Sequence, residues 1–271
     1  MKTRIITAIV IVALIIPIVI FSSTVVFPIA LAIVNLIGVY EMLGCTKMRK
    51  KHFLSVPLYM FAVVVPFLLR YLRSEMFEIL PKMVILLLLF VLYLLSVVVF
   101  SRTEMHIGEV FASAMLSIYV IGACSCIMYI RDFEYGEFLW LFIFIGAWVT
   151  DVFAYFTGML LGKHKLIPAV SPKKTVEGSI GGIVFCVAAF VIYGLILNHF
   201  FDPNVKIIPI AVTGLVASIV SQIGDLSMSV IKRNYGIKDF GTIFPGHGGI
   251  LDRFDSIMAV AVILSIAMQF V

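Results

Sequence analysis

Residues 83–100, MVILLLLFVLYLLSVVVF, decide the fold, because they contain no charged side chain along their whole length. A helix needs about 20 apolar residues to cross the hydrocarbon core of a bilayer, and this run comes close to that length. A strand of a transmembrane barrel would instead alternate apolar and polar residues over about ten positions. The run therefore predicts a transmembrane helix.

Similar apolar runs recur on both sides, and the composition agrees with them. Hydrophobic residues make up 62% of the 271 positions and charged residues only 13%, whereas a soluble domain carries roughly 25% charged residues. We predict an all-α, polytopic membrane protein that forms a single integral membrane domain over residues 1–271. About nine spans are expected, at residues 1–21, 25–44, 53–69, 83–100, 109–130, 138–161, 178–200, 207–228 and 250–271.

The distribution of positive charge orients these spans. With the N-terminus in the cytoplasm, fifteen of the 20 Lys and Arg residues fall in cytoplasmic segments, as the positive-inside rule requires. Nine spans then put the C-terminus outside. The polar segment before the last span would face the cytoplasm, where nucleotides and Mg²⁺ are available.

Polar and charged residues are distributed unevenly along the chain. They concentrate after residue 146, whereas residues 1–130 hold few polar groups within the predicted spans, with Asn35 and Glu41 as exceptions. Ionisable residues inside a membrane are costly and usually functional. We therefore expect residues 1–130 to be mainly scaffold and residues 146–271 to carry the chemistry.

The first polar cluster is in residues 148–162, WVTDVFAYFTGMLLG. On a helix, Asp151 and Tyr155 share one face. Gly158 and Gly162 continue that face and permit close contact with another helix. A carboxylate at the bilayer centre costs about 2.5–3.5 kcal/mol on insertion scales, so it normally faces a polar cavity or a partner. We expect Asp151 and Tyr155 to line a site; a simple hydrogen bond from Asp151 to a neighbouring helix is the alternative.

Residues 171–178, SPKKTVEG, predict the N-terminus of a helix. Ser171 can cap this helix, and Pro172 suits its first position. Lys173 and Lys174 would then lie beside free backbone N–H groups, an arrangement that attracts anions. The alternative is a solvated basic loop.

The last polar segment, residues 229–255, reads SVIKRNYGIKDFGTIFPGHGGILDRFD. Asp225 precedes it, and the hydroxyl of Ser229 lies one helical turn further on the same face. Asp252 and Asp255 are i, i+3 neighbours at the start of the last span, so they also share a face. Carboxylate and hydroxyl oxygens suit a hard divalent cation. The predicted metal ligands are Asp225, Ser229, Asp252 and Asp255. The alternative is that each carboxylate, taken singly, is the partner of an ion pair.

Positively charged residues in the same segment suit phosphate groups, and its glycines would let the backbone approach a ligand closely. The segment contains no Walker A motif, and His247 has no second His or Cys at the spacing of zinc ligands. Positioning and charge neutralisation are the main requirements of phosphoryl-type transfer. The candidate phosphate-contacting residues are Lys232, Arg233, Lys238, His247, Gly248 and Arg253.

Residues 229–255 resemble the C-terminal signature of the phosphatidate cytidylyltransferases along their whole length. The motifs Asp-x2-Ala-Tyr-x2-Gly from Asp151 and SPKKTVEG from Ser171 resemble the same family. The resemblance implies an inner-membrane enzyme of phospholipid biosynthesis that joins CTP to phosphatidic acid, giving CDP-diacylglycerol and pyrophosphate. It also implies Mg²⁺, allows a second cation such as K⁺ beside it, and implies a homodimer among membrane lipids with no nucleic-acid partner.

The resemblance further implies roles for individual residues. Asp225, Asp252 and Asp255 would be the metal carboxylates, with Ser229 beside them. Lys232 and Arg253 would neutralise phosphate oxygens, so they join Asp252 and Asp255 in the catalytic set. The predicted substrate-binding residues are Asp151, Tyr155, Ser171, Lys173, Lys174, Arg233, Lys238, His247 and Gly248.

Other classes of protein stay open at this point. A polyprenol kinase or a CDP-archaeol synthase would share a membrane site for a lipid and CTP. A transporter of anionic substrates could also place carboxylates within a membrane, although the chain has no visible inverted repeat. A CDP-alcohol phosphotransferase is disfavoured because its DGx2AR…Gx3Dx3D motif is absent.

Overall fold

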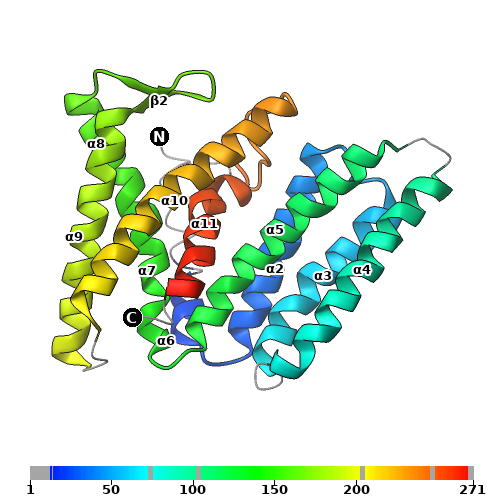
Figure 1. The fold of residues 1–271 in the computed structure, drawn as a ribbon, viewed down its shortest axis with the longest axis horizontal. Helices are drawn as coiled ribbons and strands as arrows, with labels where there is room; N and C mark the ends of the chain where they lie inside the picture. The colour runs from blue at the N-terminus through cyan, green and yellow to red at the C-terminus, as the bar shows by residue number, and fades with distance from the viewer. Residues whose placement is uncertain are drawn as a thin grey trace. The chain divides into compact units, whose positions relative to one another are not determined.

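The computed structural model shows a helical chain in two compact units (Figure 1). The N-terminal unit comprises Met1–Met128 with Phe240–Leu251, and the C-terminal unit comprises Tyr129–Asp239 with Asp252–Val271. This division falls close to the predicted change from scaffold to chemistry at residue 130. The single domain stays a prediction. The structure describes residues 13, 15–72, 76–101, 105–201, 205–244 and 248–267, with the backbone alone for 76–84.

Apolar helices build the N-terminal unit. They are α2 (Val26–Cys45), α3 (His52–Tyr71), α4 (Met76–Phe100) and α5 (Ile107–Arg131), whose last residues belong to the other unit. Leu43, Leu58 and Val110 are fully buried in their shared core. A Cβ added at Gly38 would lie only 2.9 Å from Val120 Cγ1, so glycine lets α2 and α5 approach closely.

Helices also build most of the C-terminal unit. The elements are α6 (Gly136–Leu139), α7 (Leu141–Phe144), the π-helical turn η2 (Ile145–Val149), α8 (Thr150–Leu161), α9 (Val176–Phe200), α10 (Ile207–Asn234) and α11 (Leu251–Ala267), of which Leu251 belongs to the other unit. Helix α9 packs against both α8 and α10. π-Helical turns are frequent at functional sites, and η2 immediately precedes the turn that carries Asp151.

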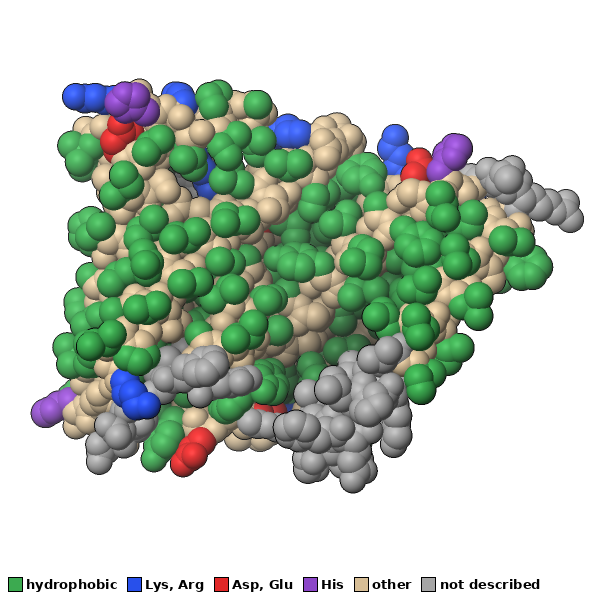
Figure 2. Space-filling model, viewed as in Figure 1, with side chains coloured by type: hydrophobic (Ala, Val, Ile, Leu, Met, Phe, Trp, Pro, Cys, Tyr) green, Lys and Arg blue, Asp and Glu red, His purple; other side chains and the backbone are tan. Residues whose placement is uncertain are grey.

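The prediction of an all-α, polytopic membrane protein is confirmed. Six helices in the described part of the chain are long and apolar enough to cross a membrane, and residues 85–100 of α4 are a shorter apolar stretch. Figure 2 shows hydrophobic side chains covering the visible helices between their ends, where the charged side chains gather. The count of nine spans and the positions of the termini stay predictions, and most of the first predicted span lies outside the described residues.

The predicted helix N-terminus at Ser171 is wrong. Ser171 and Pro172 lie in strand β2 (Ser171–Thr175), which pairs with β1 (Lys165–Ile167) as an antiparallel hairpin. Thr175 caps α9 instead, since its Oγ1 accepts a hydrogen bond from the backbone N–H of Gly178 at 3.1 Å. A threonine at the N-cap satisfies a donor that the helix leaves unpaired, and the proline is tolerated because its strand is at an edge.

The polar segment 229–255 is less of a loop than the sequence predicts. Helix α10 continues to Asn234 and α11 begins at Leu251, so helices hold both ends of the segment. Ser229 and Lys232 therefore follow Asp225 on one helix at i+4 and i+7, and all three share a face.

Small residues bring α8 and α9 together, as the sequence predicts. A Cβ added at Gly158 would lie 2.7 Å from Thr175 Oγ1, and one added at Gly178 would lie 2.5 Å from the carbonyl oxygen of Ala154. Neither backbone could approach its neighbour this closely with a larger side chain. Gly182 makes a third close approach, since a Cβ added there would lie 2.9 Å from the Thr150 carbonyl oxygen.

The close approach at Gly182 can be tested by substitution. We expect Gly182→Ala to lower the free energy of unfolding by about 1–3 kcal/mol, because the added methyl group meets a backbone atom that cannot move aside. The measurement is the melting temperature of the purified protein in detergent. Gly122→Ala in α5 is the matched control, since nothing lies within 4 Å of its added Cβ. Equal melting temperatures for Gly182→Ala and Gly122→Ala would contradict the packing argument.

Candidate active site

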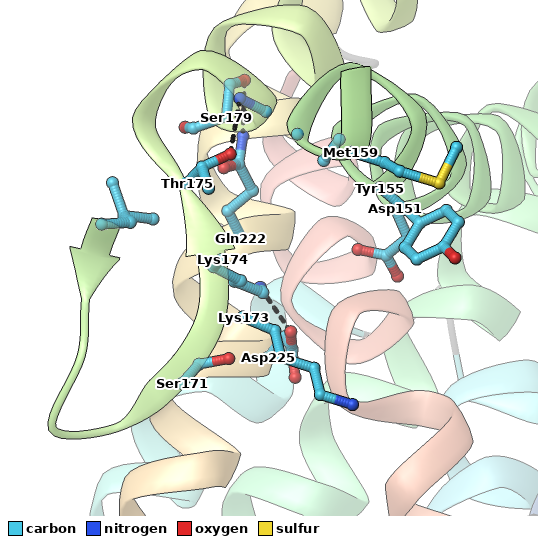
Figure 3. Close-up of a pocket in the computed structure, with 14 residues that line it drawn as sticks. Asp151, Tyr155, Met159, Ser171, Lys173, Lys174, Thr175, Ser179, Gln222 and Asp225 are labelled. Atoms are coloured by element: carbon cyan, nitrogen blue, oxygen red, sulfur yellow. Dashed lines mark hydrogen bonds and ion pairs between the residues drawn. The ribbon is translucent and has the colours of Figure 1, made fainter. Parts of the chain in front are cut away.

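A cavity of about 400 Å³ opens within the C-terminal unit, between α8, the hairpin, α9 and α10. Figure 3 shows its lining side chains, which come from all four elements. Apolar residues form part of the wall, and charged groups face one another across it. The predicted site residues that line the cavity are Asp151, Tyr155, Ser171, Lys173, Lys174 and Asp225.

Helix α8 supplies one wall. Asp151, Tyr155 and Gly158 lie on the face that the sequence predicts, and all three line the cavity. The Asp151 carboxylate also accepts a hydrogen bond from Ser256 Oγ on α11 at 3.3 Å. Asp151 therefore lines the cavity and also bonds a neighbouring helix, and its role in a substrate site stays a prediction.

Strand β2 supplies the opposite wall and its positive charge. Lys173, Lys174 and Ser171 line the cavity from this strand. The ammonium group of Lys174 forms an ion pair with the carboxylate of Asp225 on α10, which Figure 3 draws as a dashed line. The two lysines thus reach the cavity from a hairpin and not from a helix N-terminus, although they still provide cations for an anionic ligand.

The hairpin is fastened at its base by Glu177 in the first turn of α9. Its carboxylate accepts hydrogen bonds from the backbone N–H of Lys163 at 3.1 Å and of His164 at 3.2 Å. The ring nitrogen Nδ1 of His164 lies 2.6 Å from the same carboxylate. These contacts join the residues just before β1 to the first turn of α9, so they close the base of the hairpin whose second strand carries Lys174.

Three carboxylates from three helices lie close enough to repel one another. Asp151 and Asp255 each interact electrostatically with Asp225 and with each other. Helices α10 and α11 approach closely here, since a Cβ added at Gly224 would lie 2.9 Å from the carbonyl oxygen of Asp255. The positive charges of Lys174 and Arg253 act on Asp151, and that of Lys232 acts on Asp255.

Asp252 has a separate partner. Its carboxylate oxygen lies 2.7 Å from Nζ of Lys232, and the two side chains are only 3% and 11% exposed. A buried ion pair is retained because removing either partner would leave an uncompensated charge. The pair links α10 to the first turn of α11, so two residues of the predicted catalytic set are brought together.

The remaining described residues of the predicted site do not line the cavity. Ser229 is half-buried on α10, whereas Arg233, Lys238 and Arg253 are exposed. Arg233 donates a hydrogen bond to the carbonyl oxygen of Ile237 at 3.5 Å, near the end of α10. Gly248 belongs to the N-terminal unit, where it has φ +86° and pairs with Phe244. His247 lies outside the described residues.

Sequence reasoning missed several polar residues at the cavity. Gln222 lines it one turn before Asp225, and its amide donates to the carbonyl oxygen of Ser179 at 3.4 Å. Thr175 lines it as well as capping α9. The signal for Gln222 was present, because a polar amide three residues before a carboxylate shares its helix face.

The carboxylates near the cavity are the candidate ligands for a metal ion. In the ranges that the structure describes, no group of three or more His, Cys, Asp or Glu side chains is arranged to hold one. Lysines compensate Asp225 and Asp252 directly. The chemistry of the set nevertheless suits Mg²⁺, because Asp151, Asp225 and Asp255 gather carboxylate oxygens that repel one another. Metal binding therefore stays a prediction.

The sequence of the chain is similar to those of known proteins over almost its whole length. A model of the cytidylyltransferase family matches residues 2–271. The phosphatidate cytidylyltransferases of Staphylococcus epidermidis strain ATCC 12228 and Staphylococcus aureus strain COL are 33% and 34% identical over 267 residues, which is 98% of both chains in each case. That of Staphylococcus saprophyticus is 40% identical over 173 residues, 64% of both chains.

These matches confirm the family that the sequence motifs predict. They cover both the apolar first half and the polar second half, so they do not rest on the signature at residues 229–255 alone. The chain belongs to the cytidylyltransferase family, and the three relatives named above are phosphatidate cytidylyltransferases.

Proposed function

We propose that this chain is a phosphatidate cytidylyltransferase, which transfers a cytidylyl group from CTP to phosphatidic acid and releases pyrophosphate. The observation that carries the proposal is the cavity with Lys173 and Lys174 on one wall and Asp151 and Asp225 on the others. It offers cations for phosphate groups beside carboxylates for a divalent cation, within apolar helices that suit a lipid substrate. Membership of the family supports the same reaction.

The chemistry is an in-line displacement at phosphorus. A phosphate oxygen of phosphatidic acid forms a bond to the α-phosphorus of CTP, and the bond from that phosphorus to the bridging β-phosphate oxygen breaks. Pyrophosphate leaves with the electron pair. A phosphomonoester has a second pKa of about 6, so the attacking oxygen is already ionised near neutral pH. The reaction therefore needs no strong general base from the protein.

The lysines would neutralise the two substrates. Lys174 already has Asp225 as its counter-charge, and Lys232 already has Asp252. Each ammonium group would exchange part of its carboxylate contact for a phosphate oxygen when substrate enters. Positioning and charge neutralisation of this kind are the main protein contributions to phosphoryl-type transfer. Lys173 on β2 and Arg253 on α11 would add to the same positive field.

Mg²⁺ would be held by Asp225, Asp252 and Asp255 with the hydroxyl of Ser229 beside them, and a second cation such as K⁺ could accompany it. When bound, Mg²⁺ supplies a positive charge that polarises phosphoryl oxygens and stabilises the leaving pyrophosphate. The mutual repulsion of Asp225, Asp255 and Asp151 supports Asp225 and Asp255 as ligands, because a cation among them would relieve it. Asp252 and Ser229 are included because the sequence motif implies them.

The setting of the enzyme is part of the same proposal. The charge distribution of the chain supports a place in the cytoplasmic membrane with the site open to the cytoplasm, where CTP is present. The family resemblance of the sequence supports a homodimer.

The reaction is tested by analysing its products. Purified protein in detergent, given CTP, phosphatidic acid and Mg²⁺, is expected to release pyrophosphate and CDP-diacylglycerol in equal amounts. A lipid kinase would instead leave CDP and a phosphorylated lipid. A transporter would move substrate across proteoliposomes without turnover. Well-folded protein that forms no CDP-lipid would refute the proposed function.

The metal is tested by neutralising one carboxylate. We expect Asp255→Asn to lower kcat by on the order of 100-fold or more, as for loss of one group that stabilises transition-state charge. EDTA should abolish activity of the wild type, and Mg²⁺ should restore it. Glu134→Gln is the control, because Glu134 is an exposed carboxylate in the turn before α6. Full activity of Asp255→Asn, or of EDTA-treated wild type, would rule out the metal assignment.

The role of Lys174 is tested against a second lysine of the same hairpin. Lys174→Gln removes a charge-assisted contact worth roughly 1.5–3 kcal/mol, so kcat/KM should fall roughly 10- to 150-fold. Lys165→Gln in β1 is the matched control, since Lys165 is exposed and is not among the residues that line the cavity. Kinetics with CTP and phosphatidic acid varied separately would show which substrate Lys174 contacts. Equal losses in the two variants would mean that only the net charge of the hairpin matters.

A further inference from the structure

Glu41 is a buried carboxylate in the half of the chain that sequence analysis assigns to scaffold. It lies on α2 and is 1% exposed. Its two oxygens have separate partners: Oε1 accepts from the backbone N–H of Ile250 at 3.0 Å, and Oε2 accepts from that of Leu251 at 2.9 Å. All of these residues belong to the N-terminal unit.

Two glycines of the polar segment 229–255 lie close to the Glu41 carboxylate. A Cβ added at Gly241 would lie 2.2 Å from Oε1 of Glu41, and one added at Gly249 would lie 2.3 Å from it. Real Cβ atoms do not approach so closely, so both positions require glycine while Glu41 keeps this place. The backbone at Gly241 and Gly249 thus lies against the Glu41 carboxylate.

The contacts of Glu41 fall at the start of α11. The first N–H groups of a helix have no partner within the helix, and a negative charge at that end is favourable. Glu41 supplies both the acceptors and the charge from another helix, because α11 begins at Leu251. The next residue along the chain is Asp252, and Asp255 follows one turn later. A helix places each residue by a fixed rotation and a rise of about 1.5 Å, so its starting point determines where these carboxylates project.

We propose that Glu41 is a positioning residue for the transfer reaction, which fixes the start and register of α11 and thereby the places of Asp252 and Asp255. The inference rests on the proposed function, because it assumes that these two carboxylates bind the metal. Glu41 is assigned no direct contact with substrate or metal in this proposal. Its effect on the reaction passes through the backbone of Ile250 and Leu251.

The test is Glu41→Gln in the full-length protein in detergent. Glutamine keeps the size of the side chain but turns an NH₂ group toward one of the two backbone donors. Loss of a residue that orients metal ligands lowers metal affinity or activity by roughly 10- to 100-fold. We therefore expect the Mg²⁺ concentration for half-maximal activity to rise by about that factor, per mole of folded enzyme. Amide hydrogen exchange at residues 250–255 should also accelerate, independently of activity.

Gly241→Ala is the second variant, and it disturbs the Glu41 carboxylate without changing residue 41. It displaces this carboxylate, because the added Cβ would lie 2.2 Å from Oε1. The Mg²⁺ requirement should therefore shift in the same direction. Glu109→Gln is the matched control, because Glu109 is an exposed glutamate in the first turn of α5. It should change neither the Mg²⁺ requirement nor hydrogen exchange in α11.

The outcomes separate this inference from the proposed function. If wild type forms no CDP-lipid, the proposed function fails. If wild type is active and Mg²⁺-dependent, but Glu41→Gln gives less folded protein with an unchanged Mg²⁺ requirement, Glu41 only stabilises the fold and the inference is overturned. Failure of both Glu41→Gln and Gly241→Ala to fold would also assign Glu41 to folding alone and overturn it.

Discussion

Compensation of carboxylates within apolar helices is the constraint on which the arrangement of the C-terminal unit depends. A charge in such surroundings is expensive unless it has a partner. Asp225 has Lys174, Asp252 has Lys232, and Asp151 has the hydroxyl of Ser256. Each contact joins two different elements, so satisfying the charges also determines which elements become neighbours. The polar chemistry and the fold of this unit are therefore specified together.

Close packing at glycine makes these contacts possible. The ion pair of Lys174 requires that β2 lie over α10, and β2 leads directly into α9 through the cap at Thr175. Helix α9 approaches α8 through Gly178 and Gly182, where a methyl group would meet backbone atoms. The glycines bind nothing themselves. They set the width of the cavity, because they determine how near the wall with Asp151 comes to the wall with the lysines.

Sequence reasoning predicted the elements well and the contacts between them less well. Periodicity showed that Asp151 and Tyr155 share a face, because that relation is local to one helix. It misplaced the cap at Ser171, since two residues of the same segment can cap a helix and only the hairpin decides between them. It left Glu41 without a role, because its partner Ile250 is 209 positions away. No pattern within one segment reports such a contact. The gathering of lysines and carboxylates at one site came from the density of charged residues after residue 146.

The paired lysines would also allow the proposed site to bind a polyanion and a metal ion together. Without substrate, the ammonium groups of Lys174 and Lys232 neutralise Asp225 and Asp252. Phosphate groups would draw these ammonium groups away, and the carboxylates would then lose their counter-charges beside Asp151 and Asp255. A divalent cation would restore the balance, because carboxylate oxygens are its preferred ligands. Binding of phosphate and binding of metal would each favour the other. The negative charges of carboxylates and phosphates would therefore be balanced only when both ligands are present.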